Sequence, residues 1–344
     1  MDGYRKQGDC MFYNMLMLHI KLTNKCDKDC QYCFDDKSTR GRVTFEDFKE
    51  LVDKSSGFKK LFFIFMGGES LLLSPMLFEE CFAYAQKVCE ERHQKCEFKV
   101  ITNGSKLNDV FIDLFKRYSV YLVVSYDGRG QHKSEIEQIT KYKEYIDTVN
   151  FTLNQENHEI LWETLQELNT LGIPHFDGYI NIHSPEEYKE TYATAMVDAI
   201  TKYRTEKPRI KWLFAQDIVQ YARFGKNAKR NAQMYGIMLN SDVSLRPGGR
   251  IMPTVLDNLH EDISIGNIYE VEHVIDLIFG EKNRKINKAY LKTLENLQTP
   301  LEKDLRGGYI FDKMATGHDW DSNWTFVSDI YQKIVDSVKD DPNV

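Results

Sequence analysis

Cysteine and long hydrophobic runs are both scarce in this chain. It holds seven cysteines in 344 residues, and none occurs after Cys96, which excludes the disulfide-rich secreted class. The apolar run near the N-terminus, residues 12–18, is interrupted by Asn14 and is too short for a signal peptide or a membrane span. We therefore expect a cytoplasmic protein. In a reducing cytosol, clustered cysteines are more often metal ligands or catalytic groups than disulfides.

An excess of positive charge is also absent. The chain has 52 acidic and 45 basic residues and a formal net charge of -7, so it lacks the basic balance of a general nucleic-acid binder. It has no internal repeat and no low-complexity linker, and its 42% hydrophobic residues are enough to fill a large core. We expect an ordered protein with no nucleic-acid partner and no membrane partner.

Six β/α units are predicted in residues 14–205, where apolar runs of strand length alternate with amphipathic, helix-like segments. A capping pattern at Thr44–Asp47 opens the first of these helices. Such alternation predicts an α/β fold with a parallel sheet covered by helices, and ligands gather at the carboxyl ends of such strands. The predicted strands are residues 15–22, 61–65, 98–102, 120–126, 149–153 and 176–182.

The pattern changes after residue 205. Residues 241–256 predict a β-hairpin that turns at Pro247–Gly249, and helices are predicted near residues 285–297 and 322–339. We therefore divide the chain into three parts: a lead-in of residues 1–13, a barrel domain of residues 14–205 and a C-terminal α+β extension of residues 206–344.

Three of the seven cysteines, Cys26, Cys30 and Cys33, lie within eight residues, directly after the first predicted strand. Three thiolates suit a four-iron cluster in which one iron lacks a protein ligand and stays open to substrate or cofactor. A zinc site would want a fourth ligand, and neither His19 nor Asp35 has a persuasive spacing. The alternatives are a zinc knuckle or a set of buried thiols.

This spacing resembles the signature of the radical S-adenosylmethionine (radical SAM) family, CX3CXΦC with Φ aromatic, and Tyr32 occupies the aromatic position. A second segment, Gly67-Gly68-Glu69, follows the second predicted strand and resembles the family's GGE motif, which holds the amino group of SAM. Glycines let a backbone approach a ligand closely, and a carboxylate suits an ammonium group. The alternative for this segment is a plain strand-to-loop turn with an exposed glutamate.

The next two predicted strands end in Asn103 and in Ser125–Asp127, in segments like those that line the SAM ribose and carboxylate in this family. Four successive strands thus end in residues of the expected kind. The resemblance implies a partial (β/α)6 TIM-like barrel with one [4Fe-4S] cluster on the three cysteines. It also implies that SAM is cleaved reductively to a 5′-deoxyadenosyl radical that abstracts hydrogen from a substrate.

By the same resemblance, the Tyr32 backbone would meet the adenine of SAM, Glu69 its amino group and Ser125 its ribose, with Asn103 and Asp127 nearby. Gly67 and Gly68 belong to the same cofactor-binding set. The partners implied are an electron donor such as flavodoxin or ferredoxin and a peptide or small-molecule substrate.

The hairpin region resembles the SPASM or twitch extensions that follow radical SAM barrels in many peptide-modifying and protein-modifying enzymes. Thr254 stands where that pattern has a cysteine, and no later cysteine exists, so auxiliary clusters are excluded in this region. An unrelated two-stranded cap is the alternative. A SPASM-like scaffold without clusters would favour redox-neutral rearrangement, epimerisation or fragmentation.

Catalytic residues are harder to identify. His183 follows the sixth strand and would donate or accept a proton there, while Tyr179 and Asp217 are weaker candidates for substrate contacts. Cys81 and Cys89 lie eight residues apart on one predicted helix, so we expect buried thiols rather than a second cluster. The stretch with His318, Asp319 and Asp321 is interpreted as a loop and a helix cap.

Three functions remain open from the sequence. The first is a radical SAM enzyme that acts on a peptide, protein side chain or amino-acid-derived substrate; the second is one that acts on a small metabolite or nucleotide. The third is a metal-binding protein without catalysis, which the Gly-Gly-Glu and Ser-Tyr-Asp-Gly segments argue against. Because only residues 1–13 precede the first strand, we expect no leader-binding domain at the N-terminus.

Overall fold

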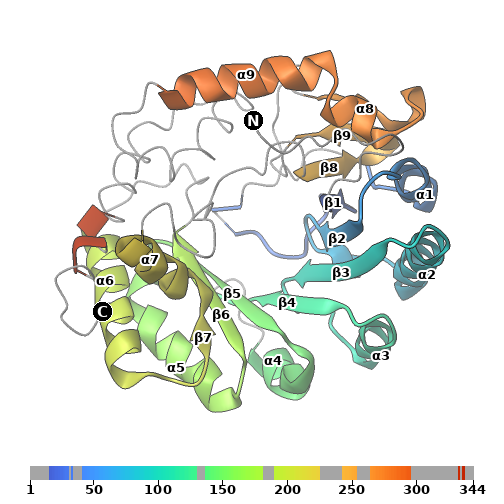
Figure 1. Cartoon of the computed structure of the whole chain (residues 1–344). Helices are drawn as coiled ribbons and strands as arrows, with labels where there is room; N and C mark the ends of the chain where they lie inside the picture. The colour runs from blue at the N-terminus through green and yellow to red at the C-terminus, as the bar shows by residue number, and fades with distance from the viewer. Residues whose placement is uncertain are drawn as a thin grey trace.

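A ten-stranded, mostly parallel sheet organises this protein (Figure 1). The computed structural model describes residues 15–30, 32–33, 41–129, 136–180, 190–224, 242–253, 264–295, 332–333 and 335–337. Cys10, His183, Thr254 and the stretch around His318 lie outside these residues. No helix in the described ranges is long and apolar enough to cross a membrane.

Seven parallel strands follow one another in chain order across the sheet, each paired with the next. Helices connect them, so the predicted α/β partial barrel is confirmed. The strands are β1 (Leu16–Lys21), β2 (Lys60–Met66), β3 (Lys95–Thr102), β4 (Tyr121–Ser125), β5 (Thr148–Leu153), β6 (His175–Ile180) and β7 (Lys211–Trp212).

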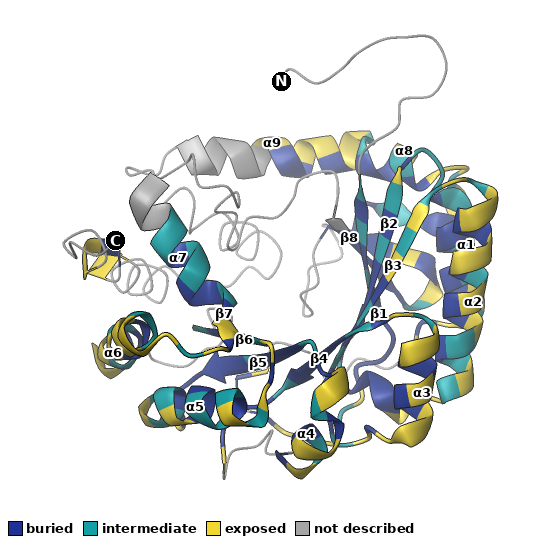
Figure 2. Cartoon of the chain, turned by 60° about the horizontal axis from the view of Figure 1, so that its bottom comes forward, coloured by how far each residue is buried: buried dark blue, intermediate teal, exposed yellow. Residues whose placement is uncertain are grey.

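The helices that connect the parallel strands cover one face of the curved sheet, which we call the outer face (Figure 2). Aromatic rings fill this layer. Between ring centroids, Phe48 of α1 (Phe45–Lys54) lies 5.6 Å from Phe65 of β2, and Phe82 of α2 (Pro75–Glu91) lies 4.6 Å from Phe98 of β3. Strand side chains alternate between the two faces. The residues between these aromatics therefore point to the opposite side, which we call the inner face.

The helix ends follow local sequence signals. Thr44 and Asp47 form the predicted capping box at the start of α1, and Ser74 caps α2 with Pro75 as its first residue. The helices are α1 (Phe45–Lys54), α2 (Pro75–Glu91), α3 (Asp109–Arg117), α4 (Ile136–Tyr142), α5 (Leu161–Leu171), α6 (Glu190–Glu206), α7 (Leu213–Phe224), α8 (Val274–Ile278) and α9 (Glu281–Glu295).

Three strands from the C-terminal third extend the sheet beyond β1. β8 (Asp242–Arg246) pairs with β1 in parallel, and it forms the predicted hairpin with the antiparallel β9 (Arg250–Met252) through a turn at Pro247–Gly249. β10 (Gly266–Asn267) is the edge strand. The sheet thus includes segments from both sides of residue 205.

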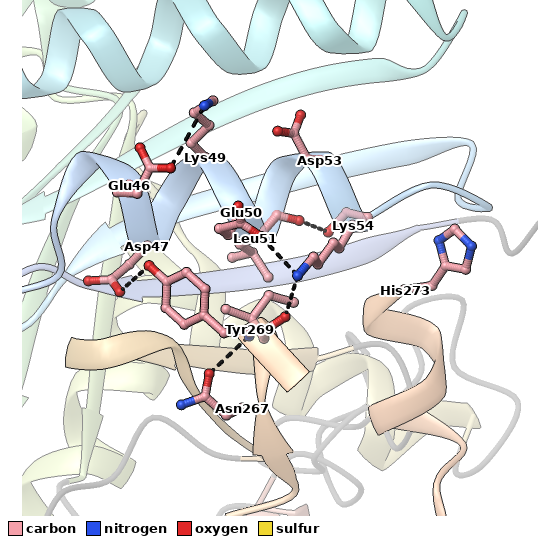
Figure 3. A network of polar contacts seen from close by, with 12 residues as sticks. Glu46, Asp47, Lys49, Glu50, Leu51, Asp53, Lys54, Asn267, Tyr269 and His273 are labelled. Atoms are coloured by element: carbon pink, nitrogen blue, oxygen red, sulfur yellow. Dashed lines mark hydrogen bonds and ion pairs between the residues drawn. The ribbon is translucent and has the colours of Figure 1, made fainter. Parts of the chain in front are cut away.

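A polar network holds this C-terminal part against α1 (Figure 3). The Tyr269 hydroxyl donates to Oδ1 of Asp47 at 3.0 Å, and Nζ of Lys54 donates to the carbonyl oxygen of Ile268 at 2.8 Å. Asp47 is at the same time the capping-box acid of α1. Asp47 therefore both caps α1 and binds Tyr269, a residue more than 200 positions later in the chain.

Candidate active site at the carboxyl edge of the sheet

The loops that follow β1, β2 and β3 meet at one edge of the sheet. Lys21 and Met66, the last residues of β1 and β2, are register partners, and the backbone N–H of Glu69 donates to the carbonyl of Lys25 at 2.8 Å. The first two predicted motifs are therefore joined by a main-chain hydrogen bond. This edge is the expected ligand side of a parallel sheet.

The cysteine loop presents its three thiols with different exposure. Cys30 is buried, Cys26 is half-buried and Cys33 is exposed, with the backbone N–H of Cys33 bonded to the carbonyl of Cys30 at 3.1 Å. Within the ranges that the structure describes, no three His, Cys, Asp or Glu side chains converge as metal ligands.

Cys26 already receives hydrogen bonds. The backbone N–H of Lys28 and Nδ2 of Asn103 donate to its Sγ, at 3.4 Å and 3.7 Å. Such donors stabilise a thiolate, and hydrogen bonds to sulfur tune iron–sulfur clusters. The predicted site residue Asn103 thus lies beside the first cysteine.

Gly67 and Gly68 are required by the cysteine loop itself. Both have positive φ, at 92° and 49°. A Cβ on Gly67 would lie 2.3 Å from Cγ of Lys21, and one on Gly68 would lie 2.2 Å from the carbonyl oxygen of Lys25. The sequence favoured glycine here for close approach to a ligand. The structure adds a second reason, the close packing of two loops.

Glu69 is fully buried, and its carboxylate accepts hydrogen bonds from the loop after β2 and from the end of β3. Oε1 accepts hydrogen bonds from the backbone N–H of Leu71 at 2.8 Å and the Thr102 hydroxyl at 2.7 Å, while Oε2 accepts from the backbone N–H of Asn103 at 2.7 Å. Burial raises the pKa of Glu69, and these hydrogen bonds oppose the rise. A carboxylate has about four lone-pair positions, so one on Oε2 remains for an ammonium group.

Asp27, which the sequence did not single out, ties the cysteine loop to the loop after β3. Its carboxylate accepts from Nδ2 of Asn103 at 2.9 Å, from the Ser105 hydroxyl at 2.6 Å and from Nζ of Lys106 at 3.1 Å. Burial alone would raise the pKa of Asp27, but these hydrogen bonds lower it to about 2. Asp27 lies between the motif cysteines at a position where the motif allows any residue, so the motif did not predict its role.

Tyr32 joins the cysteine loop to the loop after β4. Its hydroxyl donates to Oδ2 of Asp127, and Oδ1 of Asp127 accepts from the backbone N–H of Thr152 at 3.3 Å. Both side chains are buried. Burial and the neighbouring Asp127 charge raise the pKa of Tyr32. The resemblance assigned its backbone to adenine; the structure gives its side chain an anchoring contact.

The remaining predicted residues are spread more widely. Ser125 is half-buried at the end of β4, Tyr179 is half-buried on β6, and Asp217 lies in α7. Cys81 and Cys89 are buried in α2, which confirms that they are core thiols.

The residues at this edge fit the two cofactors that the family resemblance implies. Three cysteines on one loop supply the soft donors that an iron–sulfur cluster needs. Glu69 supplies a buried carboxylate with one acceptor position left for the ammonium of SAM.

Comparison with known proteins agrees with this arrangement. The Radical SAM superfamily matches residues 20–195, about half of the chain. A relative described as the uncharacterized protein MJ0907 of Methanocaldococcus jannaschii is 26% identical over 121 residues, which cover 34% of this chain and 41% of that protein. The match therefore spans less than half of the relative's length.

Solved structures share the fold over most of the chain. The structure of anSMEcpe with bound AdoMet has a TM-score of 0.70 at 14% identity and covers 94% of this chain and 98% of its own. SuiB of Streptococcus suis bound to S-adenosylmethionine has a TM-score of 0.57 at 14% identity, covering 83% and 73%. Both proteins have also been solved with a peptide, Cp18Cys for anSMEcpe and the precursor peptide SuiA for SuiB.

At these identities the structural likeness establishes the fold alone. The superfamily match includes the cysteine loop, the Gly-Gly-Glu loop and the segments that follow β3 and β4. This chain is therefore a member of the radical SAM superfamily and an enzyme of that superfamily.

Proposed function

We propose that this enzyme holds one [4Fe-4S] cluster on Cys26, Cys30 and Cys33 and binds SAM beside it. When bound, the two cofactors supply a 5′-deoxyadenosyl radical, which abstracts hydrogen from a peptide, protein side chain or amino-acid-derived substrate. The proposal rests mainly on one observation: hydrogen bonds join the cysteine loop, the Gly-Gly-Glu loop and the loop that contains Asn103 at one edge of the sheet.

The chain's own residues position these groups. Asn103 and the Lys28 backbone hold Cys26, Glu69 offers an acceptor to the SAM ammonium, and the half-buried Ser125 lies at the end of β4 for the ribose. Tyr32 and Asp127 fix the end of the cysteine loop against the neighbouring strand ends. Such fixed geometry is the protein's contribution to cofactor chemistry.

Two observations support a peptide-type substrate. The similar folds of anSMEcpe and SuiB were both solved with a peptide bound. The hairpin of β8 and β9 also lies where the sequence resembles a SPASM extension. We propose that residues 206–344 form this extension without an auxiliary cluster, because no cysteine occurs after Cys96. We further propose a flavodoxin or ferredoxin as the electron donor.

Anaerobic reconstitution with iron and sulfide, followed by dithionite and SAM, tests the proposal. We expect about four irons per chain, as one [4Fe-4S] cluster requires, and 5′-deoxyadenosine in the products by mass spectrometry. Replacing Cys26, Cys30 and Cys33 together by alanine removes both the iron and the 5′-deoxyadenosine. Bound zinc with intact SAM, or full SAM cleavage by the triple variant, would contradict the proposal.

A further inference from the structure

One row of side chains crosses five strands on the inner face, below the loops that carry the site. Cross-strand register aligns Ser244 of β8, His19 of β1, Ile64 of β2, Lys99 of β3 and Tyr121 of β4, and we call these five residues the inner row. At about 3.3 Å per strand residue, the row lies about 7 to 10 Å below the ends of β1 and β3. A substrate that entered beneath the cofactors would meet it.

Lys99 is the charged member of this row. Its Nζ lies 5.7 Å from the centroid of the Tyr121 ring and makes no hydrogen bond or ion pair with the residues that the structure describes. Burial lowers the pKa of Lys99, and the charge of Asp177 on β6 opposes this. Lys99 is half-buried, and an ammonium that is partly removed from water without a hydrogen bond or ion pair loses solvation energy that a bound anion would restore.

Ser244 is an independent sign of a ligand at the other end of the inner row. Its side chain is fully buried, and its hydroxyl has no hydrogen-bond partner among the described residues. Native proteins satisfy most buried polar groups, so each exception needs a physical reason. Three strand spacings, about 14 Å, separate Ser244 from Lys99. One extended substrate is long enough to meet both.

The charge of the upper inner face favours an anionic ligand. Lys21 and Arg246, at the ends of β1 and β8, are 1% and 4% exposed and alternate onto the same face as the inner row. Asp177 of β6 alternates onto the same face, so it offsets part of this positive charge. Buried cations in a low-dielectric surrounding attract an anion more strongly than surface lysines do.

We propose that Lys99 binds a carboxylate of the substrate on the inner row, and that Ser244 lies within the same binding surface. A lysine ammonium offers three hydrogen-bond donors and a compact charge, which suit a carboxylate. The carboxylate would be an acidic side chain or a chain end. This inference rests on the proposed function, because it names the substrate class of the same site.

Three blocked amino acids of nearly equal size serve as probes. N-acetylglutamate α-amide carries a side-chain carboxylate, N-acetylglutamine carries an α-carboxylate, and N-acetylglutamine amide carries none. Their affinities for the reconstituted, SAM-bound protein are measured by saturation-transfer NMR. We expect at least one acidic probe to bind about tenfold or more tightly than the neutral one, as a charge-assisted hydrogen bond allows. The preferred probe tells which carboxylate is recognised.

Variants tie this preference to one residue. Lys99→Met keeps the length of the side chain and should remove the preference, whereas Lys99→Arg should retain it. Lys95→Met, an exposed lysine on the same strand, is the matched control and should behave as wild type. Equal affinities of the wild type for all three probes, no binding of any of them, or a preference that persists in Lys99→Met would overturn the inference.

The wild-type protein also separates this inference from the proposed function. A carboxylate preference without 5′-deoxyadenosine formation would refute the radical chemistry and leave the Lys99 site standing. Formation of 5′-deoxyadenosine without a carboxylate preference would refute the Lys99 site and leave the radical chemistry standing. Thermal unfolding of Lys99→Met confirms that a lost preference does not come from a lost fold.

Discussion

At the scale of single residues, Glu69 has more contacts than its motif predicted. The sequence assigned it to the amino group of SAM, and that role stays a prediction. The structure shows that the same carboxylate holds the Leu71 and Asn103 backbones and the Thr102 hydroxyl. A substitution here therefore changes both a cofactor contact and the packing of two loops.

Two substitutions at Glu69 separate these effects. Glu69→Gln keeps the shape of the side chain and can keep the acceptor for Leu71 and Thr102. It removes the charge that pairs with an ammonium and the acceptor for the Asn103 N–H, so SAM affinity should fall about tenfold or more. Glu69→Ala should also lower the melting temperature, because each buried donor left without its acceptor costs about 1 to 3 kcal/mol. Anaerobic calorimetric titration with SAM and thermal unfolding measure the two quantities. Unchanged SAM affinity in Glu69→Gln would show that the carboxylate is structural only.

Asp27 leads to a second prediction about a single residue. Asp27→Ala removes the contacts to Asn103, Ser105 and Lys106, so the cysteine loop loses its link to the loop after β3. Because Asp27 is partly exposed, we expect an intact fold but a several-fold faster release of iron to a chelator from the reconstituted protein. The control is Asp113→Ala, an exposed acid on α3. Equal release rates in the two variants would rule out the positioning role.

At the scale of elements, the first helix connects the two ends of the chain. Asp47 caps α1 and also accepts a hydrogen bond from Tyr269. Thr44→Ala should lower the free energy of unfolding by about 1 kcal/mol through the cap alone. Asp47→Ala should lower it further, because the contact with Tyr269 is lost as well.

A double-mutant cycle of Asp47→Ala and Tyr269→Phe isolates that contact. We expect a coupling energy of about 0.5 to 1.5 kcal/mol from denaturant unfolding, the usual value of a single hydrogen bond. Additive effects of the two substitutions would mean that the C-terminal part is held against α1 by other contacts.

Sequence patterns predicted elements better than they predicted partners. Alternating apolar runs identified β1 to β6, and Thr44 and Asp47 identified the start of α1, because these signals are local. The pairing of β8 with β1 depends on residues more than 200 positions apart, and no local pattern encodes it. The same holds at the carboxyl edge and the inner face: the cysteine motif could be recognised from its spacing, whereas no local pattern singled out Lys99.

At the scale of the whole molecule, β8 gives β1 its second neighbour. A chain ending after α6, at Glu206, would leave one side of β1 unpaired, and open strand edges promote aggregation. We therefore expect this truncated chain to be aggregated on size-exclusion chromatography, while the full chain is not. A truncated chain that is monomeric and unfolds cooperatively would show that residues 14–205 fold alone.

The position of β8 also sets an order of events during synthesis. β1, the strand that precedes the cysteine loop, is made more than 200 residues before its parallel partner β8, which ends at Arg246. β1 therefore acquires both of its neighbours only after the ribosome has passed Arg246. Until then, the cysteine loop follows a strand, β1, that is paired on one side only. Iron delivered before that point would meet a loop that is not yet held in place, so cluster insertion should follow, rather than precede, the synthesis of β8.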